Sequence, residues 1–220
     1  MLRPTDERAV TLMNVASPDR IGILGGTFNP FHLGHLILAQ DALEQLSLSR
    51  VVFVPCATPP HKKCRGLISA RHRLAMVEAA VESDERFTVS DVEIKRGGPS
   101  YAVDTVREIR GLHPDAAISF IAGSDSLAEL HLWKDVYDLL CLCEFNVFER
   151  PGGFSISEAR DALRLKSPWR ERVAANLARG HRVEISSSEI RHRIAEGLSI
   201  RYLVHPAVEM YISEHRLYAG

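Results

Sequence analysis

Short apolar runs alternate with amphipathic runs along most of this chain, and that alternation limits the fold more than any other feature. The apolar runs predict buried strands at 20–24, 51–55, 87–94, 117–123, 144–150 and 182–185. The amphipathic runs predict helices at 33–47, 69–83, 100–112, 186–197 and about 206–216. This order is typical of parallel strands joined by crossover helices. The expected fold class is therefore α/β, a doubly wound parallel sheet with flanking helices and a small C-terminal helical part.

Local signals sharpen several of these boundaries. Ser69 is the expected N-cap of the helix at 69–83, and Gly197 is expected to end the helix at 186–197. The stretch 56–68 contains prolines and charges and is predicted to be a loop. The stretch 151–181 is less regular, although Ser167 and Pro168 are expected to open a helix within it.

The length and composition of the chain are those of a protein with a full core. Of 220 residues, 45% are hydrophobic and 25% charged, so burial alone can stabilise the fold without disulfides or metals. Residues 1–19 lack a signal-peptide core and are expected to form a flexible N-terminal tail. Residues 20–220 are expected to form a single domain with a C-terminal helical portion at about 186–220.

Charge and cysteine content exclude several classes of function. The formal net charge is −1, so no overall field draws the chain to nucleic acid or to a membrane surface, and no apolar run is long enough to span a bilayer. Cys56, His61 and Cys64 could approach a metal, but a fourth ligand is missing. The four cysteines, Cys56, Cys64, Cys141 and Cys143, are instead expected to be free thiols in the cytoplasm, with no metal site. Formation of a homo-oligomer is left open.

The residues that suggest chemistry gather where predicted strands end. Four such loops span 25–34, 55–63, 123–125 and 186–191. In an open parallel sheet, ligands bind beyond the carboxyl ends of the strands, near the point where the strand order reverses. We therefore expect these loops to surround one ligand.

The loop at 25–34 has the composition of a phosphate site. Gly25 and Gly26 expose bare backbone, and the following helix directs its N-terminal amides toward the same place. His32 and His35 are three residues apart and can face one way near that helix start. Neither the GxGxxG nor the GxxxxGK[ST] pattern occurs here. The alternative is a tight turn followed by two solvated histidines.

The loop at 186–191 suggests a second anion site. Ser186 and Glu189 fit a capping box, which is a purely structural explanation of those two residues. It does not explain Ser187, Ser188 and Arg191, which place two further hydroxyls and a guanidinium at the helix start. Two helix N-termini that converge suit a polyphosphate better than a single phosphate.

The loop at 55–63 is the weaker signal. Two prolines stiffen it, and it presents His61, Lys62 and Lys63 at a strand end. A lysine pair on a loop is usually only solvated, so this loop contributes to binding only if it lies beside the first one.

Several stretches together resemble a known enzyme family. They are "GGTFNPFHLGH", "PPHK", "SYAVDT", "GSDSL", "ERPG" and "ISSSEIRHRI" with "GLSIRYLV". In this order they resemble the bacterial nicotinate-nucleotide adenylyltransferases, members of the nucleotidyltransferase superfamily with HxGH and ISSSxIR-type motifs. The resemblance runs from about residue 20 to the C-terminus and implies a Rossmann-like sheet.

The resemblance also implies an activity and a set of site residues. The activity is transfer of the adenylyl group of ATP, accompanied by Mg²⁺, to nicotinate mononucleotide, giving nicotinate adenine dinucleotide and pyrophosphate. The implied catalytic residues, which hold the ATP phosphates, are His32, His35 and Arg191. The implied ATP-binding residues are Gly25, Gly26, Thr27, Phe28, Lys62, Gly123, Asp125, Ser187 and Ser188. The implied mononucleotide-binding residues are Tyr101, Ala102 and Trp133, with Trp133 stacking on the pyridine ring.

Three positions depart from the family pattern. Asn29 stands where many relatives carry aspartate, and Ser188 where threonine is commoner. Ala102 stands where relatives often place a threonine that meets the nicotinate carboxylate, which leaves the choice between acid and amide open. The alternatives are an adenylyltransferase for nicotinamide mononucleotide or phosphopantetheine, and a nucleotide-sensing module without catalysis.

Overall fold

One parallel sheet organises the computed structural model, which describes residues 19–60, 66–149 and 155–219. Its six strands within these residues are β1 (Arg20–Gly26), β2 (Arg50–Pro55), β3 (Phe87–Val89), β4 (Ala117–Gly123), β5 (Glu144–Phe148) and β6 (Leu177–Ala178). The strand order is β3-β2-β1-β4-β5-β6, and every pair is parallel. The order reverses between β1 and β4, so the predicted doubly wound sheet is confirmed.

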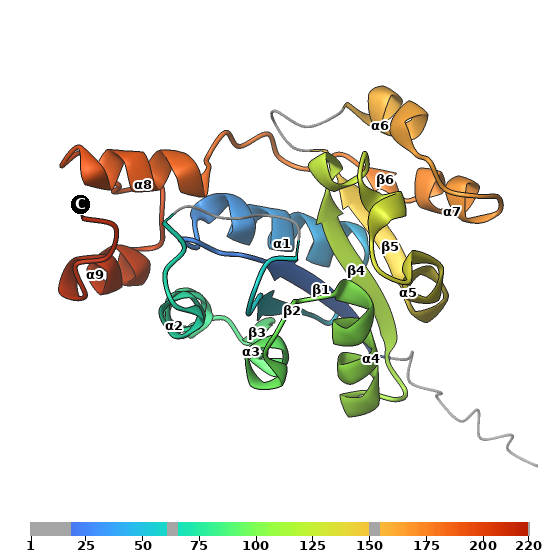
Figure 1. Cartoon of the computed structure of the whole chain (residues 1–220), viewed down its shortest axis with the longest axis horizontal. Helices are drawn as coiled ribbons and strands as arrows, with labels where there is room; N and C mark the ends of the chain where they lie inside the picture. The colour runs from blue at the N-terminus through green and yellow to red at the C-terminus, as the bar shows by residue number, and fades with distance from the viewer. Residues whose placement is uncertain (1–18, 61–65, 150–154, 220) are drawn as a thin grey trace, which may run out of the picture.

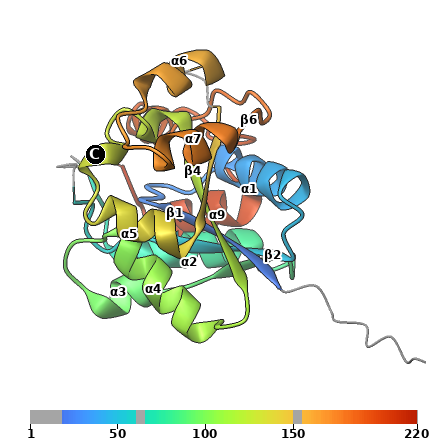
Figure 2. The ribbon, with the colours of Figure 1, turned by 90° about the vertical axis from the view of Figure 1, so that its right-hand side faces the viewer.

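Helices cover both faces of the sheet, as Figures 1 and 2 show. The helices of the first face are α1 (Leu33–Gln45), α2 (Ala70–Val81), α8 (Ser187–Ala195) and α9 (Pro206–Glu214). Those of the second are α3 (Val92–Arg96), α4 (Ala102–Leu112), α5 (Val136–Leu142), α6 (Ile156–Ala162) and α7 (Trp169–Ala175). Two short 3₁₀ turns, η1 (Ser124–Ser126) and η2 (Leu130–Leu132), connect β4 to α5.

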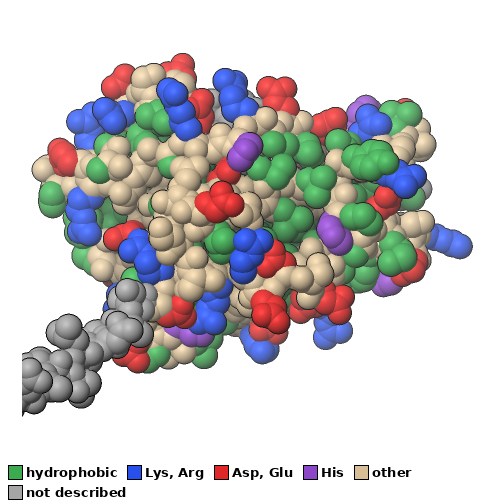
Figure 3. Space-filling view, turned by 180° about the vertical axis from the view of Figure 1, so that it is seen from behind, with side chains coloured by type: hydrophobic (Ala, Val, Ile, Leu, Met, Phe, Trp, Pro, Cys, Tyr) green, Lys and Arg blue, Asp and Glu red, His purple; other side chains and the backbone are tan. Residues whose placement is uncertain are grey.

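The core follows from the alternation of side chains along the strands. Ile21 and Ile23 of β1 are fully buried against the second face, whereas Leu24 packs on the first. On the surface, acidic and basic side chains intermingle over the face seen in Figure 3, in keeping with the balanced charge. Within the described ranges, no helix has the length and apolar character that crossing a membrane requires.

Most of the predicted boundaries are confirmed within a few residues. Ser69 caps α2 by accepting a hydrogen bond from the backbone N of His72, and Pro168 is the N-cap of α7. Gly197 follows α8 with a left-handed φ of 68°, a conformation that glycine adopts without strain. The predicted tail lies almost wholly in residues 1–18, outside the described residues, so the division into tail and domain stays a prediction.

Two predicted strands are wrong in part or whole. The segment 87–94 is a strand only to Val89, which lies opposite Phe53 of β2, and from Val92 it forms α3. The segment 182–185 is not a strand, and β6 takes the place beside β5 instead. The chain just before 182 is held on α1, where the backbone N and the Nδ1 of His181 lie 2.7 and 2.6 Å from the Asp41 carboxylate.

Candidate functional site

A cleft of about 450 Å³ lies at the carboxyl ends of β1, β2 and β4. Described parts of all four predicted loops line it. The predicted site residues along it are Gly25, Gly26, Thr27, Phe28, His32, His35, Tyr101, Ala102, Gly123, Asp125, Trp133 and Ser187. Ser188 and Arg191 are not among the lining residues, and Lys62 lies outside the described residues. The four predicted loops therefore meet at one cleft, as expected for a parallel sheet.

The two histidines of the first loop form one stacked unit. Their ring centroids are 3.7 Å apart with an interplanar angle of 25°. His32 is the N-cap of α1, and its backbone N donates to Nδ1 of His35 over 3.2 Å. Because Nδ1 accepts this hydrogen bond, the hydrogen-bond geometry assigns the ring hydrogen of neutral His35 to Nε2. His35, which lines the cleft, can thus donate a hydrogen bond from Nε2.

Buried aromatic rings hold the backbone of this loop. Phe28 has a left-handed φ of 48°, and its ring contacts those of Phe31 and His35 edge-on. A Cβ on Gly26 would lie 2.7 Å from the Phe28 ring, so only glycine fits there. A Cβ on Gly25 would meet nothing closer than 4.0 Å, which leaves its backbone open to a ligand, as predicted.

The start of α8 is bonded to the same loop. Ser186 caps the helix by accepting from the backbone N of Glu189 over 3.1 Å. Ser187 Oγ donates to the Pro30 carbonyl over 2.8 Å, across 157 residues of sequence. Arg191 Nη1 donates to the Asn29 carbonyl over 2.7 Å, and Nη2 to Ser188 Oγ over 3.2 Å. The two predicted anion sites therefore form one continuous wall, and Arg191 lies beside the cleft, anchored to the loop.

Another part of the cleft wall contains aromatic side chains and the start of α4. Tyr101 is the N-cap of α4, and Ala102 is its first residue. Trp133 packs edge-on against Phe120 and Phe145, with centroids 6.0 and 5.8 Å away. These contacts fix the indole plane while part of the side chain stays exposed.

Arg73 of α2 is a site residue that sequence reasoning missed. It is 1% exposed, and its guanidinium donates to three carbonyls, those of Thr27 at 2.7 Å, Ala57 at 3.0 Å and Ile68 at 3.3 Å. It thereby ties the loop after β1 to the loop after β2. An arginine on the apolar face of a predicted helix was the available signal, because a buried arginine needs several acceptors.

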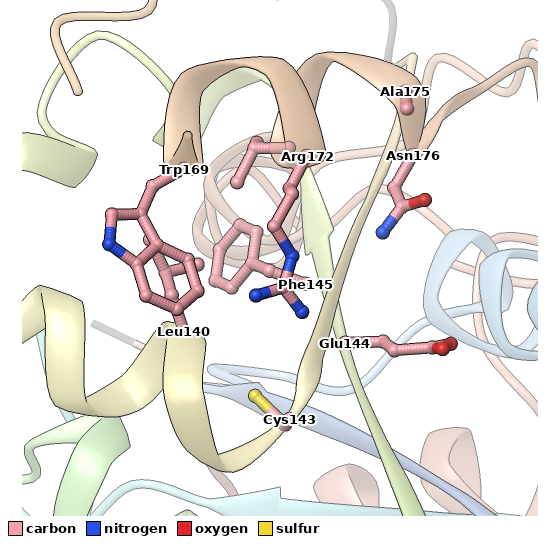
Figure 4. A pocket seen from close by; sticks show the side chains of 9 residues that line it. Leu140, Cys143, Glu144, Phe145, Trp169, Arg172, Ala175 and Asn176 are labelled. Atoms are coloured by element: carbon pink, nitrogen blue, oxygen red, sulfur yellow. The ribbon is translucent and has the colours of Figure 1, made fainter. Parts of the chain in front are cut away.

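The described cysteines are free thiols, and one of them borders a second cavity. Within the described part of the chain, no group of three or more His, Cys, Asp or Glu could hold a metal, and Cys56, Cys141 and Cys143 are free thiols. His61 and Cys64 lie outside the described residues. A smaller cavity of about 240 Å³ lies between α5, β5 and α7, where burial raises the pKa of the Cys143 thiol to about 12 (Figure 4).

Comparisons with known proteins agree with this geometry. The cytidylyltransferase-like family model matches residues 23–193. A protein of Geobacter sp. (strain M21), named "Probable nicotinate-nucleotide adenylyltransferase", is 44% identical, over 90% of this chain and 98% of its own length. A protein of Shouchella clausii with the same name is 45% identical, over 90% and 96%. The solved Plasmodium falciparum nicotinic acid mononucleotide adenylyltransferase complexed with NaAD shares the fold, with a TM-score of 0.70 at 20% identity over 91% and 97%.

Proposed function

Because the chain belongs to the nicotinate-nucleotide adenylyltransferase family, within the cytidylyltransferase-like superfamily, we propose that it transfers the adenylyl group of ATP to nicotinate mononucleotide. The products are nicotinate adenine dinucleotide and pyrophosphate, in NAD biosynthesis. The observation that carries this proposal is a single cleft whose wall contains two joined helix starts and a partly exposed tryptophan. We place the reaction in the cytoplasm.

The triphosphate of ATP is assigned to the wall formed by α1 and α8. His32 and His35 stand at the start of α1, Ser187 and Ser188 at the start of α8, and both helix dipoles favour anions there. Arg191 adds a fixed positive charge beside them. The bare backbone of Gly25 and Gly26 and the residues Thr27 and Phe28 line the floor.

The remaining lining residues are assigned to the adenosine ribose and to the pyridine ring of the mononucleotide. Gly123 ends β4 and Asp125 lies in η1; both line the cleft, and we assign them to the adenosine ribose. Trp133 is assigned to the pyridine ring, with Tyr101 and Ala102 beside it. Asp104 and Thr105 donate their backbone N–H groups to the Tyr101 carbonyl, whereas those of Ala102 and Val103 have no acceptor within α4 by their position and can donate to a ring substituent.

The reaction requires positioning and charge stabilisation and no base. The mononucleotide phosphate is already an anion and attacks the α-phosphorus of ATP in line, while pyrophosphate leaves on the opposite side. Holding the two reactants in place contributes on the order of 7–11 kcal/mol, and one well-aimed donor on the order of 3 kcal/mol. His35, with its ring hydrogen on Nε2, is assigned as such a donor to the α-phosphate.

Mg²⁺ enters this proposal with ATP. The described residues form no cluster of three or more carboxylates, histidines or thiols that could hold the ion by itself. Mg²⁺ commonly keeps several waters and binds through substrate phosphates, which fits such a site. It would neutralise part of the triphosphate charge.

The deciding experiment measures pyrophosphate release. Wild-type protein is mixed with ATP and Mg²⁺, and either nicotinate or nicotinamide mononucleotide is added in parallel. Release with the acid form supports the proposal, release only with the amide form reassigns the substrate, and ATP binding without release indicates a sensing module.

His35→Ala tests the assigned donor in the same assay. We expect kcat to fall about 10²- to 10³-fold because a preorganised donor to the transferring phosphate is lost, with mononucleotide affinity little changed. His113→Ala, at the end of α4 and outside the cleft lining, is the matched control. An unchanged turnover number in His35→Ala would remove His35 from the mechanism.

A further inference from the structure

Glu93 of α3 is a buried carboxyl group that the proposed mechanism does not use. Its side chain is 5% exposed, and it lines the cleft together with Tyr101, Ala102 and Thr105. It therefore stands in the wall at the end assigned to the pyridine ring. A buried carboxyl beside a site for an anionic ring needs an explanation, because two negative charges repel strongly where water is excluded.

The hydrogen bonds of Glu93 are incomplete for an ionised carboxylate. Thr105 Oγ1 donates to Oε1 over 2.5 Å, and the Ser100 hydroxyl is close enough to lower the pKa of the carboxyl group. Among the described residues Oε2 has no hydrogen-bond partner, and it is shielded from solvent. An ionised carboxylate with such an oxygen loses its hydration without replacement, whereas the neutral acid loses much less.

The charges around Glu93 do not compensate for this. Burial is the largest influence and raises the pKa of Glu93, while the Ser100 and Thr105 hydrogen bonds lower it. Arg96 of the same helix also lowers this pKa, but Glu108 of α4, which accepts from Arg96 Nη1 over 2.5 Å, raises it. Among the described residues, Glu93 also interacts electrostatically with the thiol of Cys56, which follows β2, and the Tyr101 phenol lines the same cleft. The neighbouring cation is thus already paired.

Glu93 also sits beside the first turn of α4. Its partner Thr105 is three residues from Ala102, where the helix begins. A negative charge at this position would occupy the positive end of the α4 dipole and oppose a second anion there. A neutral group leaves that end available.

We propose that Glu93 is a specificity-determining residue, held as a neutral carboxylic acid in the cleft wall so that the start of α4 can accept the carboxylate of a nicotinate ring. This inference rests on the proposed function. The preference for acid over amide then depends on an uncharged Glu93. As pH rises and Glu93 ionises, affinity for the acid falls, while affinity for the uncharged amide does not.

The test compares two dissociation constants. Nicotinate and nicotinamide mononucleotide are titrated by calorimetry into wild-type protein, Glu93→Gln and Glu129→Gln from mildly acidic to alkaline pH. The shared phosphate titrates alike in both ligands and cancels in their ratio. Glu129 lines the same cleft but is exposed, so its variant removes an equal charge that water already screens.

In wild type and Glu129→Gln, we expect the ratio to favour the acid and to fall at least about tenfold as pH rises. In Glu93→Gln, whose amide is neutral and of similar shape, the ratio should stay at the value that wild type has at the lowest pH. A melting curve checks that this variant is folded.

Three results overturn the inference. A wild-type ratio independent of pH removes the role of Glu93, and so does a Glu93→Gln ratio that follows the wild-type fall. A Glu93→Gln variant that prefers the acid much more than wild type at neutral pH shows that Glu93 is ionised there. In each case pyrophosphate release by wild type would leave the proposed function standing, whereas binding of neither mononucleotide would overturn both.

Discussion

The two helix starts that form the anion wall are built in opposite ways. The start of α1 is part of the core, since Phe28 and His32 are each 2% exposed and Phe31 is fully buried. The start of α8 lies at the surface, where Ser186 and Ser188 are exposed. The start of α1 is therefore held by packing, whereas the polar side chains at the start of α8 are held by a few hydrogen bonds, although Ile190 of the same helix is buried in the core.

This difference sets the order of dependence between the two halves. Ser187 and Arg191 reach the carbonyls of Pro30 and Asn29, which belong to the loop before α1. Asn29 is itself 4% exposed, and its Oδ1 accepts from the Tyr218 hydroxyl over 2.8 Å. The loop before α1 is thus the template on which α8 is positioned. Damage to the template should cost stability, and loss of a polar contact at the start of α8 should cost mainly function.

Arg73→Met should produce the largest effect on the template side. It leaves the carbonyls of Thr27, Ala57 and Ile68 without their donor in a buried place, so we expect the free energy of unfolding to fall by about 3 kcal/mol. For a chain of this size that corresponds to a fall in Tm on the order of 10 °C. Calorimetry measures it, with Arg71→Met, an exposed neighbour on α2, as control.

Arg191→Lys should separate the two halves. Lysine cannot reproduce the two-nitrogen bridge between Asn29 and Ser188, so we expect the KM for ATP to rise about tenfold. Because the side chain is only half buried, the free energy of unfolding should change by less than about 1 kcal/mol. Steady-state kinetics and denaturant titration measure the two effects, with Arg193→Lys as the control. A large loss of stability would mean that α8 is part of the core unit.

Ser187→Ala should give the smallest effect and refine the same comparison. One hydrogen bond to the Pro30 carbonyl is lost, which corresponds to about 1 kcal/mol. We expect a change of a few fold in the KM for ATP and a shift in Tm of a few degrees at most. Ser213→Ala, an exposed serine of α9, controls for the loss of a hydroxyl. Kinetics identical to wild type would show that Arg191 alone positions α8.

Much of the sheet could be predicted because its signals are local. The runs at 117–123 and 51–55 are apolar enough to be buried on both sides, and β4 begins and ends where predicted. The run at 182–185 has two β-branched residues but no strand partner among the described residues, since β6 takes the place beside β5 and His181 is hydrogen-bonded to Asp41. Strand propensity without a partner did not produce a strand.

The candidate site divides in the same way. The glycines, histidines and serines at predicted strand ends and helix starts indicated an anion site, because the carboxyl ends of parallel strands share one edge. The roles of Arg73 and Glu93 could not be predicted, because a buried charge or acid is defined by partners distant in sequence, such as Thr27 and Thr105. The periodicity of a sequence predicts which face of a helix is buried, but it does not predict which hydrogen-bond partners the buried side chains will meet.

The amino-acid sequence by itself determined the alternation of strands and helices and the chemistry at their junctions, since both depend on residues close together in the chain. Only the tertiary structure decided that the start of α8 meets the loop before α1 and that Glu93 stands behind the start of α4. The contact between Ser187 and Pro30 spans 157 positions of sequence, and that between Arg191 and Asn29 spans 162. Such contacts form only once the sheet has brought its strand ends to one edge.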